Sequence, residues 1–81
     1  MITEVIIMLE NLRALREDRD IKQKTMAEML QVHQTTYSDY ELGRLNVPND
    51  VLIKLARYFD TSVDYILGVT DETRPYPRKK K

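Results

Sequence analysis

Three side chains that could together support nucleophilic catalysis lie close together in the sequence: His33, Ser38 and Asp39. A serine nucleophile needs a base within hydrogen-bonding reach and an acid that orients this base. His33 directly precedes a helix that is expected to begin near residue 34, and Ser38 and Asp39 lie on that helix. The three side chains therefore point in diverging directions. The sequence offers no second histidine and no glycine-rich loop. It therefore gives little support to an enzyme.

Metal and redox chemistry have equally little support. The chain contains no cysteine and one histidine, so a zinc site would depend on carboxylates alone. We expect no metal and no cofactor. The apolar run Val5–Leu9 is too short to span a membrane, and it follows Glu4 rather than the basic flank of a signal peptide. We therefore expect a cytoplasmic protein without a membrane partner.

The polar side chains can act only if helices position them, and the hydrophobic spacing predicts five helices. Apolar residues recur at three- and four-residue intervals, and only two glycines and three prolines interrupt them. We expect helices at about residues 3–18, 23–30, 34–42, 49–59 and 63–67. Gly43 and Gly68 are suited to end helices, and Ser62 to cap the last one. No strand-like alternation occurs, so the predicted fold class is all-α.

The start of the first helix is open to two interpretations. Thr3 could cap it, but Met8-Leu9-Glu10 would also make a normal start. Ile6 and Ile7 fall outside the apolar stripe, so they either contact a partner or form additional helix surface.

The second and third helices form a candidate helix-turn-helix unit. The three-residue turn Gln31–His33 joins them, and the small residue Ala27 permits a close approach of the two helices. We expect residues 1–68 to form one domain, followed by an extended polar and basic tail over residues 69–81.

These elements resemble the Cro/CI-like (XRE) family of helix-turn-helix regulators from Gram-positive bacteria and their phages. The resemblance covers residues 12–70 and is strongest at the end of this range. The residues that carry it are Leu12-Arg13-x-Leu15-Arg16, Gln23, Met26-Ala27-Glu28-x-Leu30, Val32, Tyr40-Glu41-x-Gly43-Arg44, Leu52–Ala56 and Ser62–Gly68.

The resemblance implies a DNA interface. The side chains expected to contact base edges in the major groove are Gln34, Thr35, Ser38 and Asp39. Those expected to contact phosphates are Gln23, Lys24, Arg44 and Asn46. His33 is expected to be a turn residue. A further DNA contact is the less favoured alternative.

The resemblance also implies a structural ion pair between Arg16 and Glu41, which would anchor the third helix to the first. Three positions depart from the family pattern. Lys22 stands where a threonine or serine cap is usual. Gln31 stands where glycine is common, so a left-handed backbone there would be strained. Asp39 stands where a neutral or basic residue is common, and its carboxylate would repel phosphates unless it accepts from a cytosine.

The function implied is that of a transcriptional repressor that binds a palindromic double-stranded DNA operator as a homodimer. Dimerisation would use the fifth helix, the segment after Gly68, or Ile6 and Ile7. The charge is a difficulty, because 13 basic and 13 acidic residues cancel and Arg78–Lys81 supplies four of the basic ones. This basic run is either a solubilising end or a DNA-contacting arm. The alternative is a protein-interaction module, such as the antitoxin of a toxin–antitoxin pair.

Overall fold

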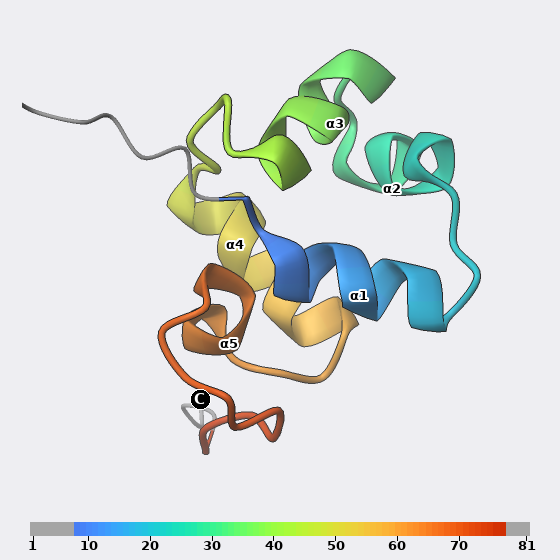
Figure 1. Ribbon diagram of the computed structural model, residues 1–81. Coiled ribbons are helices and arrows are strands. Elements are labelled where there is room, and N and C mark those ends of the chain that lie inside the picture. The colour runs from blue at the N-terminus through green and yellow to red at the C-terminus, as the bar shows by residue number, and fades with distance from the viewer. Residues whose placement is uncertain (1–7, 78–81) are drawn as a thin grey trace, which may run out of the picture.

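The computed structural model describes residues 8–77, and its regular elements are five helices with no strand in that range (Figure 1). They are α1 (Glu10–Asp18), α2 (Gln23–Leu30), α3 (Gln34–Leu42), α4 (Asn49–Tyr58) and α5 (Val63–Leu67). The all-α prediction is confirmed. The bounds of α2, α3 and α5 are those expected from the sequence, and α4 ends one residue earlier.

The start of α1 differs from the expected start at Thr3. Met8 and Leu9 are not helical, and Leu9 is the residue before the first turn, with φ −84° and ψ 71°. Its backbone N–H donates to the carbonyl of Glu41 in α3 at 2.9 Å. The helix prediction is therefore wrong for residues 8 and 9, and the observed start at Glu10 agrees with the second interpretation, a start at Met8-Leu9-Glu10. Residues 1–7, with Ile6 and Ile7, lie outside the described range.

The core takes buried residues from all five helices, which packs them into one body. The largest side chains that are fully buried come from each of the five helices: Leu12, Met26, Tyr37, Leu55 and Ile66. Tyr37 and Tyr40 belong to this core, as their position on the inner face of the third helix predicts.

Polar side chains form hydrogen bonds with the backbone at the ends of α4 and α5. Arg19 donates to the carbonyls of Tyr58 (3.3 Å) and Phe59 (3.1 Å) at the end of α4, and its guanidinium lies 5.0 Å from the centre of the Phe59 ring. Asn11 in α1 donates to the carbonyl of Tyr65 in α5 at 2.7 Å. Ser62 caps α5 by accepting from the Tyr65 N–H at 3.0 Å, which confirms its predicted role. These bonds fix the frame that carries α2 and α3.

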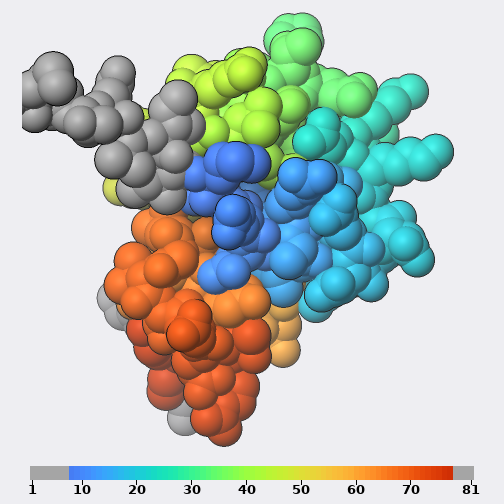
Figure 2. Space-filling model, in the orientation of Figure 1, coloured from blue at the N-terminus to red at the C-terminus, as the bar shows by residue number. Residues whose placement is uncertain are grey.

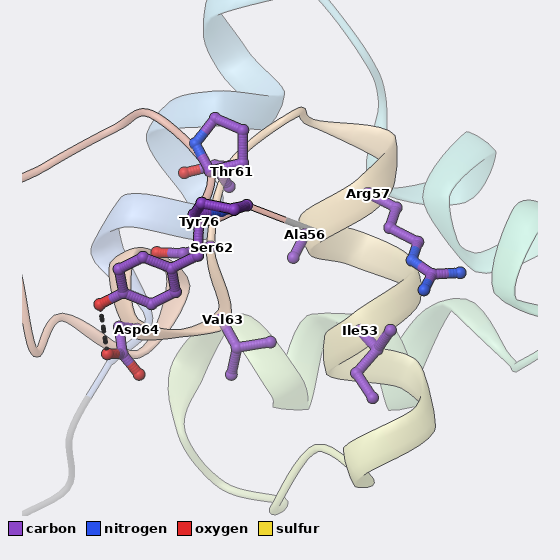
Figure 3. Close-up of a pocket in the computed structure, with 10 residues that line it drawn as sticks. Ile53, Ala56, Arg57, Thr61, Ser62, Val63, Asp64 and Tyr76 are labelled. Atoms are coloured by element: carbon purple, nitrogen blue, oxygen red, sulfur yellow. Dashed lines mark hydrogen bonds between the residues drawn. The ribbon is translucent and has the colours of Figure 1, made fainter. Parts of the chain in front are cut away.

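The segment after α5 contains no helix up to residue 77, but it lies against the body. The hydroxyl of Thr61 donates to the carbonyl of Thr73 at 2.7 Å, and the hydroxyl of Tyr76 donates to Asp64 at 2.7 Å (Figure 3). Together with α4 and α5, this segment lines an open, mainly apolar hollow of about 340 Å³.

The turn between α2 and α3 contains a strained residue. Gln31 has φ 59° and ψ 43°, a left-handed conformation that costs a residue with a Cβ about 1 kcal/mol. We expect Gln31→Gly to raise the free energy of unfolding by about 0.5–1 kcal/mol and the melting temperature by several degrees. Thermal denaturation followed by circular dichroism measures this. Gln31→Ala keeps the Cβ and is the control, and an alanine variant stabilised as much as the glycine variant would contradict the explanation.

Candidate nucleic-acid interface

The joint between α2 and α3 is closed by a backbone hydrogen bond and by buried apolar side chains. The N–H of Val32 donates to the carbonyl of Ala27 at 3.0 Å, and both Ala27 and Leu30 are buried. The two helices lie together at one side of the molecule (Figure 1). The sequence Gln31–His33 therefore forms the tight turn of a helix-turn-helix unit.

One side of α3 is polar and accessible, and the other side is core. Gln34 and Thr35 are exposed, and Ser38 and Asp39 one turn later are half-buried. None of these four residues expected at base edges is buried in the core, so all remain possible contacts. Tyr37, Tyr40 and Glu41 fill the opposite side.

The N-termini of α2 and α3 have no side-chain cap. Lys22 and His33 occupy the cap positions, and neither side chain accepts a hydrogen bond from the first turn of its helix. Backbone N–H groups at an uncapped helix start can bind an anion, and the helix dipole favours this. Both helix starts thus retain donors that a phosphate could use.

Glu41 connects α3 to both preceding helices. Its carboxylate accepts from Arg16 Nε at 2.6 Å and Nη2 at 3.2 Å, and from Gln23 Nε2 at 3.2 Å. Only 3% of the Glu41 side chain and 11% of the Arg16 side chain are exposed. The ion pair that the resemblance implies is therefore present, and it is largely buried. Arg16 also donates to the carbonyl of Ile21 at 2.9 Å, which holds the loop before α2.

The charge state of Glu41 follows from these bonds. Burial opposes ionisation of its carboxyl, but the hydrogen bonds from Arg16 and Gln23 and the neighbouring Tyr37 outweigh it and lower the pKa below the ordinary value of 4.5. Burial, together with the adjacent Glu41, raises the pKa of Tyr37. Its buried hydroxyl has no hydrogen-bond partner among residues 8–77. Tyr37 is therefore a packing residue and cannot stack on a base.

Gln23 makes a contact that the sequence did not predict. It was expected to hold a phosphate, yet one N–H of its side-chain amide is donated to Glu41. The amide carries two N–H donors, so the second one remains for a phosphate. The bond to Glu41 spans 18 residues, and no local pattern indicates it.

The remaining residues expected at phosphates are exposed: Lys24, Arg44 and Asn46. The loop that carries Arg44 is fixed to α3, because the N–H groups of Arg44 (2.9 Å) and Leu45 (3.4 Å) donate to the carbonyl of Asp39. Gly43 permits this turn with φ 74°. Arg44 and Asn46 are thus held close to the end of α3.

Other kinds of site find no support in the part of the chain that the structure describes. Residues 8–77 contain no group of three or more side chains placed to bind a metal. No helix among them is long and apolar enough to cross a membrane. The hollow between α4, α5 and residues 75–77 is lined by no residue of α2 or α3. The polar side of the helix-turn-helix unit is therefore the candidate site.

Comparison with known proteins supports this assignment. Residues 12–66 match the sequence model of a family described as helix-turn-helix. The chain is 38% identical over 71 residues to YobD, an uncharacterised HTH-type transcriptional regulator of Bacillus subtilis, covering 88% of this chain and 63% of that protein. It is also similar to two further HTH-type transcriptional regulators of Bacillus subtilis. ImmR is 32% identical over 73% of this chain and 46% of that protein, and AnsR is 30% identical over 86% of this chain and 60% of that protein. No solved structure matches the chain significantly.

This chain belongs to the helix-turn-helix family of transcriptional regulators, of the Cro/CI-like (XRE) type that its sequence resembles. It spans about half to two thirds of the length of the relatives it matches.

Proposed function

We propose that this domain is a transcriptional repressor that binds a two-fold symmetric DNA operator as a homodimer. One α3 helix would enter the major groove of each half-site, with the two centres about 34 Å apart, one turn of the duplex. The observation that carries the proposal is the polar and accessible side of α3, a helix that directly follows a tight turn. On the opposite side of α3, the hydrogen bonds of Glu41 to Arg16 and Gln23 hold the helix in place.

The contacts divide into those that read bases and those that hold the backbone. Gln34 can make two hydrogen bonds to adenine, and the methyl group of Thr35 can contact that of thymine. Ser38 and Asp39 lie one turn further along α3 and would reach the adjacent base pairs. Asp39 fits only where it accepts from the amino group of a cytosine.

Phosphate contacts set the register of α3 in the groove. Lys24 and the second N–H of Gln23 lie at the start of α2, beside its backbone N–H groups. Arg44 and Asn46 lie beyond the other end of α3. The recognition helix would thus be held to the sugar-phosphate backbone at both of its ends.

The test is selection of bound duplexes from a random pool, followed by anisotropy titrations of wild type, Gln34→Ala and Lys24→Ala. We expect Gln34→Ala to lose preference at one base pair per half-site, which amounts to about 1–3 kcal/mol of discrimination, and to keep residual binding. Lys24→Ala is the control, because loss of a phosphate contact weakens all sequences about equally. If Gln34→Ala retains the wild-type base preference, Gln34 does not read a base.

The alternative is a protein-interaction module such as an antitoxin. The observation in its favour is charge, because residues 1–77 contain nine basic and 13 acidic residues. Purification of the untagged chain from its host distinguishes the two proposals. A small basic protein that stays bound, together with weak retention of every duplex, would favour the interaction module over the repressor.

A further inference from the structure

The hollow between α4, α5 and residues 75–77 is a part of the fold that the DNA interface does not use. Its volume of about 340 Å³ is within the range of small-molecule pockets, about 300–1,000 Å³. In Figure 2 the residues after α5 (red) pack against α5 (orange), at the end of the molecule opposite to α3 (green). A ligand in this hollow would therefore leave the polar side of α3 free.

The walls of the hollow are mainly apolar. Ile53 and Ala56 line it from α4, Val63 lines it from the start of α5, and Pro75 and Pro77 line it from the C-terminal segment. Ile53 is 48% exposed, so the protein's own side chains leave part of this wall open to solvent. Removal of apolar surface from water is favourable, so these walls suit the apolar body of a ligand.

Two hydroxyl groups at the hollow are already bonded within the fold. Thr61 donates to the carbonyl of Thr73 at 2.7 Å, and Ser62 accepts from the N–H of Tyr65 at 3.0 Å. These bonds hold the C-terminal segment and the start of α5 in place. The preference of the hollow for one ligand over another must then depend on its charged side chains.

Asp64 is a charged group that remains accessible to a ligand. Its Oδ2 accepts from the hydroxyl of Tyr76 at 2.7 Å, which leaves Oδ1 for a second donor. Asp64 forms no salt bridge within residues 8–77. The bond places the ring of Tyr76, a residue that is 56% exposed, beside the carboxylate (Figure 3). A carboxylate and an aromatic ring that lie side by side both attract a cation.

Arg57 is the other charged side chain that lines the hollow, and by itself it would favour an anion. In Figure 3 its guanidinium points away from Asp64 and Tyr76. An anion bound to Arg57 would therefore be separated from these two side chains and would gain nothing from them. A cation uses both of them together, so it is the occupant that matches the hollow better.

We propose that this hollow binds a small organic cation with an apolar body, of the arylalkylammonium class. The ammonium group would donate to Oδ1 of Asp64 and lie against the ring of Tyr76. The apolar body would pack between Ile53 on α4 and Val63 on α5. The site is independent of the proposed repressor function, and the experiments on it need no DNA.

Three probes that share a phenylethyl body and differ in charge test the proposal: phenethylammonium, phenethyl alcohol and phenylpropionate. Titrations followed by NMR of the methyl groups locate the binding site, and we expect shifts at Ile53, Ala56 and Val63. We expect phenethylammonium to bind about tenfold more tightly than the alcohol, because a partly exposed ion pair and a cation–π contact each contribute modestly. Phenylpropionate should bind more weakly than the alcohol, because its carboxylate would face Asp64.

Asp64→Asn is the decisive variant, because the introduced amide oxygen can still accept from Tyr76 while the negative charge is removed. We expect the preference for the ammonium ion over the alcohol to disappear. Asp50→Asn is the matched control. Asp50 is also an acidic residue in the first turn of its helix, but it does not line the hollow, so the preference should remain about tenfold. Circular dichroism shows whether each variant is folded.

The other outcomes would overturn the proposal. Equal affinities for the ammonium ion and the alcohol would mean that charge has no part in binding. Tighter binding of phenylpropionate would identify Arg57 as the anchor and the ligand as an anion. A preference that survives Asp64→Asn, or that Asp50→Asn removes as well, would place the cation elsewhere. Absence of methyl shifts at Ile53, Ala56 and Val63 with millimolar phenethylammonium would mean that the hollow does not bind this class of ligand.

Discussion

Arg16→Ala is expected to lower the free energy of unfolding by about 3 kcal/mol, the largest stability change we predict for a single substitution. The substitution would leave the Glu41 carboxylate 3% exposed and without its cation. It would also free the carbonyl of Ile21, which accepts from Arg16 at 2.9 Å. A small domain has only about 5 kcal/mol or somewhat more to lose, so about 2 kcal/mol would remain and the unfolded fraction would rise to a few per cent at about 25 °C. Urea denaturation followed by circular dichroism measures the loss.

Arg13→Ala is the matched control for this prediction. Arg13 lies in the same helix and pairs with Glu17 at 3.5 Å, but the two side chains are 53% and 52% exposed. We expect a change of about 0.5 kcal/mol or less. Equal losses for both arginine variants would mean that burial of the Glu41 pair contributes nothing.

The pH dependence of the Arg16→Ala loss identifies its cause. The pKa of Glu41 is lowered in the folded protein, so the ion pair contributes fully above the ordinary value of 4.5 and its contribution disappears as the pH falls through the folded-state pKa. In the variant, the buried carboxyl can become neutral by taking up a proton. The loss caused by Arg16→Ala should therefore be smaller at about pH 3.5 than at pH 7.

Operator affinity is expected to fall by about 10³-fold or more between 50 and 200 mM salt. We expect about three to four phosphate contacts per subunit, which gives a dimer a log–log slope near −6. Residues 1–77 contain more acidic than basic side chains, so the domain as a whole does not attract DNA. Binding must then depend on a few well-placed cations and helix starts. Anisotropy titrations of a selected operator at several salt concentrations measure the slope.

Lys24→Ala provides the calibration for the salt series. Removal of one cation from each subunit should make the slope of a dimer less steep by about 2. A duplex of unrelated sequence is the second control. Its affinity should be lower than that of the operator at every salt concentration, and it should still fall as the salt concentration rises. A wild-type affinity that barely changes over this salt range would rule out the proposed phosphate contacts.

Local patterns in the sequence were sufficient for most of the fold. The ends of α3 and α5 were predictable because Gly43 and Gly68 adopt left-handed conformations, with φ 74° and 80°, that other residues enter at a cost. The start of α5 was predictable because Ser62 caps it within three residues. Interactions of this kind involve neighbours in the chain, so the order of residues alone specifies them.

The tertiary structure decided whatever depends on contacts between distant residues. The carbonyl of Glu41 binds the N–H of Leu9 and so sets the start of α1, while the carboxylate of Glu41 takes one of the two donors of Gln23. Thr61 and Tyr76 hold a segment that its composition describes only as polar and extended. The sequence shows which side chains can donate or accept, but only the packing of segments that are 12 or more residues apart in the chain brings these donors to their acceptors. For the same reason, the sequence indicated the polar side of α3, and only the fold showed that Glu41 bonds its opposite side to Arg16 and Gln23.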